Sequence, residues 1–256
     1  MSLFRIINQP YFMIYFLDTI NHILKTWESS FYTQPVLLVT LILALVISIR
    51  FRKRHKGLIL LPYYLILFII EILSDYVAAF IYYNKIFNPK EFNFVCYLDY
   101  LLTVIELLTF VIFFHSEIKS NKLKRILVLV SSFFCIYFLS EFFLNPEFPS
   151  SVSDNTQSRV YTLEAIILLG GCSFYFLEVF RKFPNINIKE ESSFWIATGL
   201  LFFLACTLPY SLIENYLRKS HYQLMLNFYS IFYLFYIFLF SMIIKAYLCR
   251  QRKLTL

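Results

Sequence analysis

The stretch GLILLPYYLILFIIEILSDYVAAFIYY, residues 57–83, decides the fold class of this chain. It contains no Lys or Arg, and its only charged side chains are Glu71 and Asp75. About 20 mostly apolar residues in a helix cross the hydrocarbon core of a bilayer. Inside that core only helices and closed barrels satisfy their own backbone hydrogen bonds. We therefore predict a transmembrane helix that holds two acidic groups.

Six further stretches have the same character, so we predict an all-α polytopic membrane bundle of seven transmembrane helices. The chain is 59% hydrophobic and 15% charged, whereas soluble domains have roughly 45–50% apolar and about 25% charged residues. We expect a seven-helix domain over residues 35–249, between an N-terminal segment 1–34 and a short basic tail 250–256. The other predicted spans are Pro35–Arg50, Asn93–Ser116, Lys124–Leu144, Arg159–Phe180, Phe194–Leu217 and Tyr222–Leu248.

Basic residues predict the orientation of the bundle. Of the 23 Lys and Arg residues, 16 follow the first, third, fifth or seventh span. Basic loops stay in the cytoplasm, which puts the N-terminus outside and the C-terminus inside. This distribution also explains the net charge of +7 without nucleic acid as a partner; the expected surroundings are the lipid bilayer of the cell membrane.

The N-terminal segment 1–34 is predicted to lie on the outer surface of the membrane. Pro10 can open a helix, and Phe12, Phe16 and Ile20 then recur at helical spacing. One apolar face is typical of an interfacial helix. An eighth span over residues 10–27 is the alternative. Asp18 interrupts the apolar run and argues against a signal peptide.

Eight acidic residues fall inside the predicted spans, and no Lys or Arg lies at the same depth. A charge at the bilayer centre costs roughly 2.5–3.5 kcal/mol, and such groups usually face the bundle interior. Counting 1.5 Å per residue places two of them near the midplane, four in the outer half and one near each mouth. In that order they are Glu71 and Glu106; Asp75, Asp99, Glu141 and Glu164; Glu214 outside and Glu178 inside.

The spacing of these acids predicts a shared cavity. Glu71 and Asp75 are four residues apart and lie on one helix face, as do Asp99, Thr103 and Glu106. Their two spans are consecutive and antiparallel, so the two polar stripes should meet in a cavity open to the outside. The candidate ligand- or proton-binding residues are Glu71, Asp75, Asp99, Thr103, Glu106, Glu164, Tyr210 and Asn227.

Three interpretations of the acids stay open. Burial and mutual repulsion favour their protonated form, so they can be neutral groups that hydrogen-bond helices together. They can instead bind a small cationic or amine-bearing ligand, or conduct protons or metal ions. Ionising Glu71 and Asp75 together would require a bound cation.

The remaining motifs carry little chemistry. The four His and five Cys are scattered, and neither HExxH nor GxSxG occurs. We therefore expect no metal site and no cofactor, and we lean away from an enzyme. Gly170-Gly171 permits close helix approach or a kink, and Pro209 is expected to bend its helix. Ser192-Ser193 is interpreted as the cap that starts the sixth span.

Seven spans, very short loops and an abundance of Phe (31) and Tyr (20) give a layout that resembles the seven-transmembrane sensor modules of bacteria. The resemblance implies a sensor or receptor-like protein that signals through a membrane or cytoplasmic partner. The alternatives are a small proton- or cation-coupled transporter and an intramembrane lipid-modifying enzyme. A retinal protein is disfavoured, because the middle of the last span, Phe232–Phe238, has no Lys.

Overall fold

The computed structural model describes residues 33–51, 58–83, 94–144, 154–182 and 191–249. The predicted interfacial helix over residues 10–27 and the tail 250–256 lie outside the described residues. Within the described helices, the side chains of Asp75, Glu214 and Asn227 are also outside the description.

The described part of the chain is entirely helical apart from short turns, which confirms the all-α prediction. One helix falls on each predicted span, and most ends differ by a few residues. The largest differences are at the starts of α7 and α4: α7 begins five residues before its predicted span, and α4 begins four residues after the start of its predicted span. The helices are α3 Thr33–Arg50, α4 Leu61–Tyr83, α5 Phe94–Glu117, α6 Asn121–Leu144, α7 Asp154–Lys182, α8 Ser192–Ser220 and α9 Tyr222–Leu248.

Five of these helices are long and apolar enough to cross a membrane: α5, α6, α7, α8 and α9. In α3 and α4 the apolar stretches with described side chains are shorter, Val36–Arg50 and Leu61–Leu73. Large apolar side chains such as Phe133 and Phe180 are 64% and 65% exposed. An outer surface of this kind is suited to lipid rather than to water, so the chain has the layout of a helical membrane protein.

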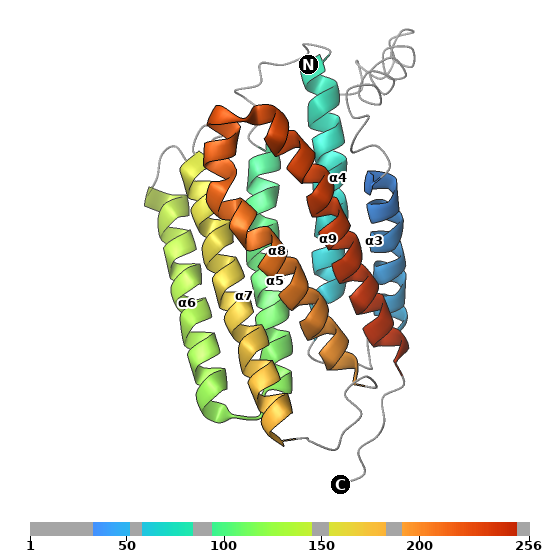
Figure 1. The fold of residues 1–256 in the computed structure, drawn as a ribbon, viewed down its shortest axis with the longest axis vertical. Coiled ribbons are helices and arrows are strands. Elements are labelled where there is room, and N and C mark those ends of the chain that lie inside the picture. Colours follow the sequence, from blue (N-terminus) through green and yellow to red (C-terminus); the bar gives the residue numbers. More distant parts are fainter. Residues whose placement is uncertain (1–32, 52–57, 84–93, 145–153, 183–190, 250–256) are drawn as a thin grey trace.

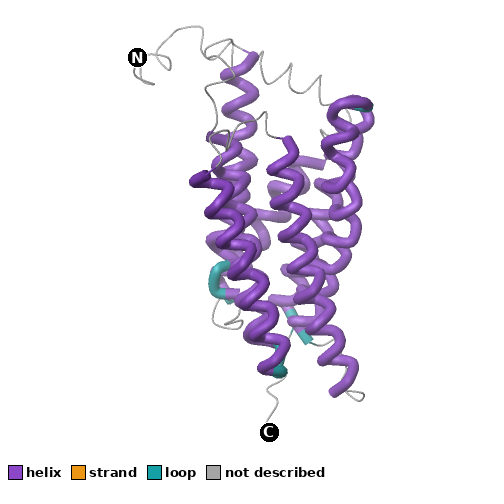
Figure 2. The backbone as a smooth tube through the Cα atoms, turned by 90° about the vertical axis from the view of Figure 1, so that its left-hand side faces the viewer, coloured by secondary structure: helices purple, strands orange, loops and turns teal. Residues whose placement is uncertain are grey.

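Six helices form a closed ring and the seventh lies outside it. Around the ring the main packing neighbours are α3, α4, α5, α7, α8 and α9, with α9 returning to α3. Helix α6 packs against α5 and α7 from outside. Consecutive helices run in opposite directions, and Figure 2 shows them lying lengthwise beside one another. Helices α5 and α7 therefore pack directly against each other, although α6 lies between them in the sequence.

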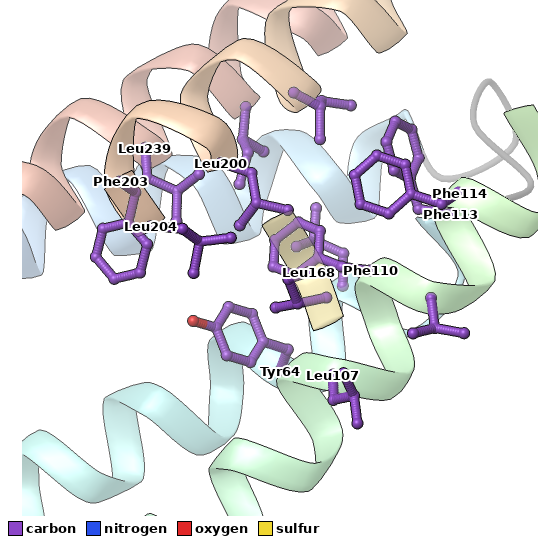
Figure 3. Close-up of a cluster of buried hydrophobic side chains, with 14 of the residues drawn as sticks. Tyr64, Leu107, Phe110, Phe113, Phe114, Leu168, Leu200, Phe203, Leu204 and Leu239 are labelled. Atoms are coloured by element: carbon purple, nitrogen blue, oxygen red, sulfur yellow. The ribbon is translucent and has the colours of Figure 1, made fainter. Parts of the chain in front are cut away.

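An aromatic core fills the half of the bundle where α5 and α7 end (Figure 3). Phe110 and Phe114 of α5 are fully buried there, beside Leu168 of α7 and Leu200 of α8. The residues come from the second half of α5 and α7 and the first half of α8. Close packing of this half leaves the opposite half of the ring as the place for a polar interior.

Two glycines allow helices to approach closely. A Cβ atom on Gly171 would lie 2.7 Å from Cδ2 of Phe114, and one on Gly199 would lie 2.7 Å from Cβ of Met242. Gly170 has no such neighbour within 4 Å. Of the Gly170-Gly171 pair, only Gly171 therefore lies at a close approach between helices.

The predicted Ser cap at the start of α8 is wrong. Glu191 occupies the N-cap position without a side-chain cap hydrogen bond, and Ser192 is the first helical residue. Ser193 instead hydrogen-bonds the Glu117 carboxyl at the end of α5. The Ser193 hydroxyl, which the sequence pattern predicted to cap α8, thus forms a contact between α8 and α5 instead. Pro209 lies inside α8.

Candidate functional site

A cavity of about 460 Å³ lies inside the helix ring, between α4, α5, α7, α8 and α9. Its walls come from the first half of α5 and α7 and from the middle of α4 and α9, so it lies in the half of the bundle away from the aromatic core. The lining residues are Phe68, Glu71, Ile72, Asp99, Leu102, Thr103, Glu106, Tyr161, Glu164, Ala165, Phe203, Leu204, Thr207, Leu208, Tyr210, Ser211, Phe232, Tyr233 and Tyr236.

Four carboxyl groups converge on this cavity: Glu71 from α4, Asp99 and Glu106 from α5, and Glu164 from α7. None of the lining residues is Lys, Arg or His. The residues of the lining therefore bring up to four negative charges and no positive one. Four ionised carboxylates without a counter-ion in a low-dielectric interior would repel one another strongly.

Hydrogen bonds show how two of the carboxyls are accommodated. The Glu71 and Asp99 side chains hydrogen-bond each other. An ionised carboxylate can only accept a hydrogen bond, so one member of this pair carries a proton. The contact also joins α4 to α5, which are neighbours in the ring.

A tyrosine holds the third carboxyl. The Tyr64 hydroxyl donates to Oε2 of Glu106 at 3.0 Å. Tyr64 is fully buried and Glu106 is 7% exposed, so water contributes little to either group. Tyr64 comes from the first turn of α4 and was not among the predicted site residues.

The fourth carboxyl of the cavity is that of Glu164. It is 7% exposed, and its Oε1 atom is buried without a hydrogen-bond partner among the described residues. Buried polar atoms are almost always paired, so an unpaired one needs an explanation. Because Glu164 also lines the cavity, its carboxyl group would be within reach of an occupant.

The rest of the wall is made of hydroxyl groups and aromatic rings. Tyr236 packs against Phe68 and Phe203 with ring centroids 4.8 and 4.5 Å apart. Tyr210 packs edge-on against Phe232 at 4.4 Å. Aromatic faces attract cations, and hydroxyls can donate to or accept from a ligand. The cavity thus combines acidic groups with surfaces that suit an organic cation.

Of the eight predicted site residues, six line this one cavity: Glu71, Asp99, Thr103, Glu106, Glu164 and Tyr210. The side chains of Asp75 and Asn227 lie outside the described ones. Whether the cavity binds a ligand or a proton stays a prediction.

Several lining residues were missed by the sequence argument, and helical spacing could have found them. Tyr161 lies three residues before Glu164, and Thr207 lies three before Tyr210 on the same helix. Residues three apart share a helix face, so each belongs to a stripe already marked by a candidate.

A second polar cluster lies at the opposite end of the bundle, around the α5–α6 turn. The backbone N–H of Lys119 donates to Oε2 of Glu178 at 2.6 Å, which ties this turn to α7. Burial raises the pKa of Glu191, and nearby Lys119 partly offsets this. Lys245 of α9 places its Nζ atom 3.3 Å from the ring centre of Trp195 in α8. These contacts fasten the helix ends together.

No group of three or more His, Cys, Asp or Glu residues in the described part of the chain is arranged to hold a metal ion. Comparison with known proteins gives no match among family models, curated proteins or solved structures. The arguments for function therefore rest on the fold and the cavity.

Proposed function

We propose that this chain is a multi-pass protein of the cytoplasmic membrane of a bacterium that acts as a sensor or receptor-like module for a small cationic ligand. The observation that carries the proposal is the acid-lined cavity, with four carboxyls and no basic residue among its lining. Its volume of about 460 Å³ falls within the roughly 300–1,000 Å³ of small-molecule sites. A protonated amine would supply the missing positive charge.

In the proposed topology all seven helices cross the membrane, with the N-terminus outside. Support comes from the alternating helix directions and from basic residues at one end, among them Arg50, Lys119, Lys124 and Lys245. Arginine and lysine are retained on the cytoplasmic side. The cavity lies in the half of the bundle away from this basic end, so a ligand would enter from outside.

Ligand binding would couple to charge within the cavity. When the cavity is empty, burial and the mutual repulsion of the four carboxyls favour their neutral, protonated forms. An incoming cation favours their ionised form, so it would displace a proton. The unpaired Oε1 of Glu164 would be the first acceptor for a ligand N–H.

The signal would pass through α8 and α9. Their outer halves contribute Tyr210 and Phe232 to the cavity wall, whereas their inner halves are fixed by the Gly199–Met242 approach and the Lys245–Trp195 contact. An occupant would shift the outer halves against the fixed inner ones. A membrane or cytoplasmic partner would detect that change, because a ligand biases a conformational equilibrium only through differential contacts.

The test is the thermal stability of the purified protein with ammonium, tetramethylammonium, choline, ethanolamine and spermidine. At least one of these is expected to raise the melting temperature of the wild type, with little effect on Glu106→Gln and Glu164→Gln. Glu141→Gln is the matched control, since Glu141 is half-buried on α6 and does not line the cavity. No stabilisation by any cation, or equal stabilisation of all the variants, would contradict the proposal.

A proton- or cation-coupled transporter is the second candidate. The observation that favours it is the pairing of Glu71 with Asp99 close to Glu106 and Glu164, since adjacent carboxyls can pass a proton. Proteoliposomes would separate the two candidates. Uptake of a stabilising cation that follows a pH gradient supports the transporter, and binding without flux supports the sensor.

A further inference from the structure

A second hollow lies on the outside of the bundle, over the beginning of α6 and the end of α5. It is an open groove of about 910 Å³. At one end it is lined by His115, Asn121, Lys124 and Arg125, and no acidic residue belongs to its lining. This groove is separate from the acid-lined cavity and shares no lining residue with it.

The groove continues along an apolar helix face. From Lys124 it follows α6 through Phe133 to Ile136, and these last two side chains are 64% and 63% exposed. Only three side chains of α6 are buried, those of Leu127, Ser131 and Phe134. Helix α6 stands outside the ring, so its outer face has no neighbour in the described part of the chain.

The two ends of the groove match the two parts of one molecule. Lys and Arg bind phosphate, and the imidazole of His115 can donate a further hydrogen bond. The N-terminus of α6, which begins at Asn121, adds the positive end of a 24-residue helix. Apolar side chains at helical spacing continue from there.

We propose that this groove binds an anionic phospholipid, with its phosphate between His115, Lys124 and Arg125 and an acyl chain along Phe133 and Ile136. The dimensions agree. Lys124 and Ile136 are 12 residues apart on one helix, which is roughly 18 Å along the axis. Half of the hydrocarbon core is about 15 Å thick, so the groove from its basic end to its apolar end has about the length of one leaflet.

Charge complementarity selects this occupant over a zwitterionic lipid. Basic pockets on the cytoplasmic side of membrane helices bind anionic headgroups, and each Lys or Arg near such a surface contributes about fivefold in affinity. Removing both Lys124 and Arg125 should therefore weaken binding by about 30-fold. A neutral headgroup would leave both cations unpaired.

The experiment measures the thermal stability of the full-length protein in detergent against phosphatidylglycerol concentration. The wild type is expected to be stabilised by phosphatidylglycerol and not by phosphatidylcholine. Lys124→Gln/Arg125→Gln should need about 30-fold more lipid for half of the effect. The control Lys119→Gln/Lys122→Gln removes the same charge from neighbouring positions that do not line the groove, and it should behave as the wild type does.

The apolar end has its own test. Phe133→Ser should weaken the lipid effect, whereas Phe143→Ser, at a 76% exposed position of the same helix, should not. Equal stabilisation by both lipids, an unchanged Lys124→Gln/Arg125→Gln variant, or an equal effect of glycerol 3-phosphate alone would overturn the proposal. So would light scattering that shows a dimer dissociated by Phe133→Ser, because a second copy would then cover this face.

Discussion

The replacement Gly171→Ala tests the packing that sets the distance between the carboxyls of α5 and α7. An added Cβ would lie 2.7 Å from Cδ2 and 3.0 Å from Cε2 of Phe114, whereas carbon atoms in contact prefer about 3.5–4.0 Å. The Phe114 ring cannot move freely, since it is fully buried. Its centroid lies 5.2 Å from that of Phe113 and 6.4 Å from that of Tyr175. Overpacking of this kind costs about 1–3 kcal/mol.

Gly170→Ala is the matched control, because a Cβ there meets no atom within 4 Å. Both replacements gain the same helix propensity, about 1 kcal/mol in soluble helices, so that contribution cancels in the comparison. Gly171→Ala should be about 1–3 kcal/mol less stable than Gly170→Ala, as measured by unfolding in detergent. Phe114→Leu should restore part of the loss in Gly171→Ala. Equal stability of the two alanine variants would refute the α5–α7 packing described above.

Three further predictions follow from single contacts. Tyr64→Phe removes the donor to Glu106 and should lower the unfolding free energy by about 1–3 kcal/mol, the cost of an unsatisfied buried acceptor; a loss no larger than that of Tyr63→Phe, at an exposed position, would argue against that hydrogen bond. Lys245→Met removes the cation above Trp195 and should cost about 0.5–1 kcal/mol, a loss absent if Trp195 is already Leu. Because burial raises the pKa of Glu191, the folded state binds its proton more tightly than the unfolded state, so this group makes the protein more stable as pH falls through its folded pKa. Glu191→Gln should flatten that part of the stability–pH curve and raise the melting temperature at neutral pH, and an unchanged curve would contradict the assignment.

The sequence was sufficient for the helices and for the polar stripe within one helix. Runs of apolar residues define each helix because a bilayer-length helix needs little else. Asp99, Thr103 and Glu106 share a face by helical spacing alone, and all three line the cavity. Because α4 and α5 follow each other in the sequence and run antiparallel, their polar stripes were also expected to meet, and Glu71 does contact Asp99.

Contacts between helices that are distant in the sequence could not be predicted in the same way. The position of Glu164 opposite Glu106 depends on α7 packing against α5, with α6 displaced outside the ring. The hydropathy of α6 resembles that of its neighbours, so nothing in the apolar pattern marks it as peripheral. The bond of Tyr64 to Glu106 spans 42 residues and depends on the relative rotation of α4 and α5. The predicted cap at Ser192-Ser193 failed for the same reason, because Ser193 hydrogen-bonds Glu117 of another helix instead of the start of its own.

The central claim is that the cavity holds neutral carboxylic acids that ionise when a cation enters. Infrared difference spectroscopy of the protein in a bilayer measures this directly, because protonated carboxyl and carboxylate groups absorb in separate bands. Without added cation at neutral pH we expect protonated-carboxyl bands that weaken in Glu106→Gln and Glu164→Gln but not in Glu141→Gln. Adding the most stabilising amine of the panel should convert part of these bands into carboxylate bands in the wild type. Carboxylate bands alone in the absence of cation, or no change on its addition, would contradict the account.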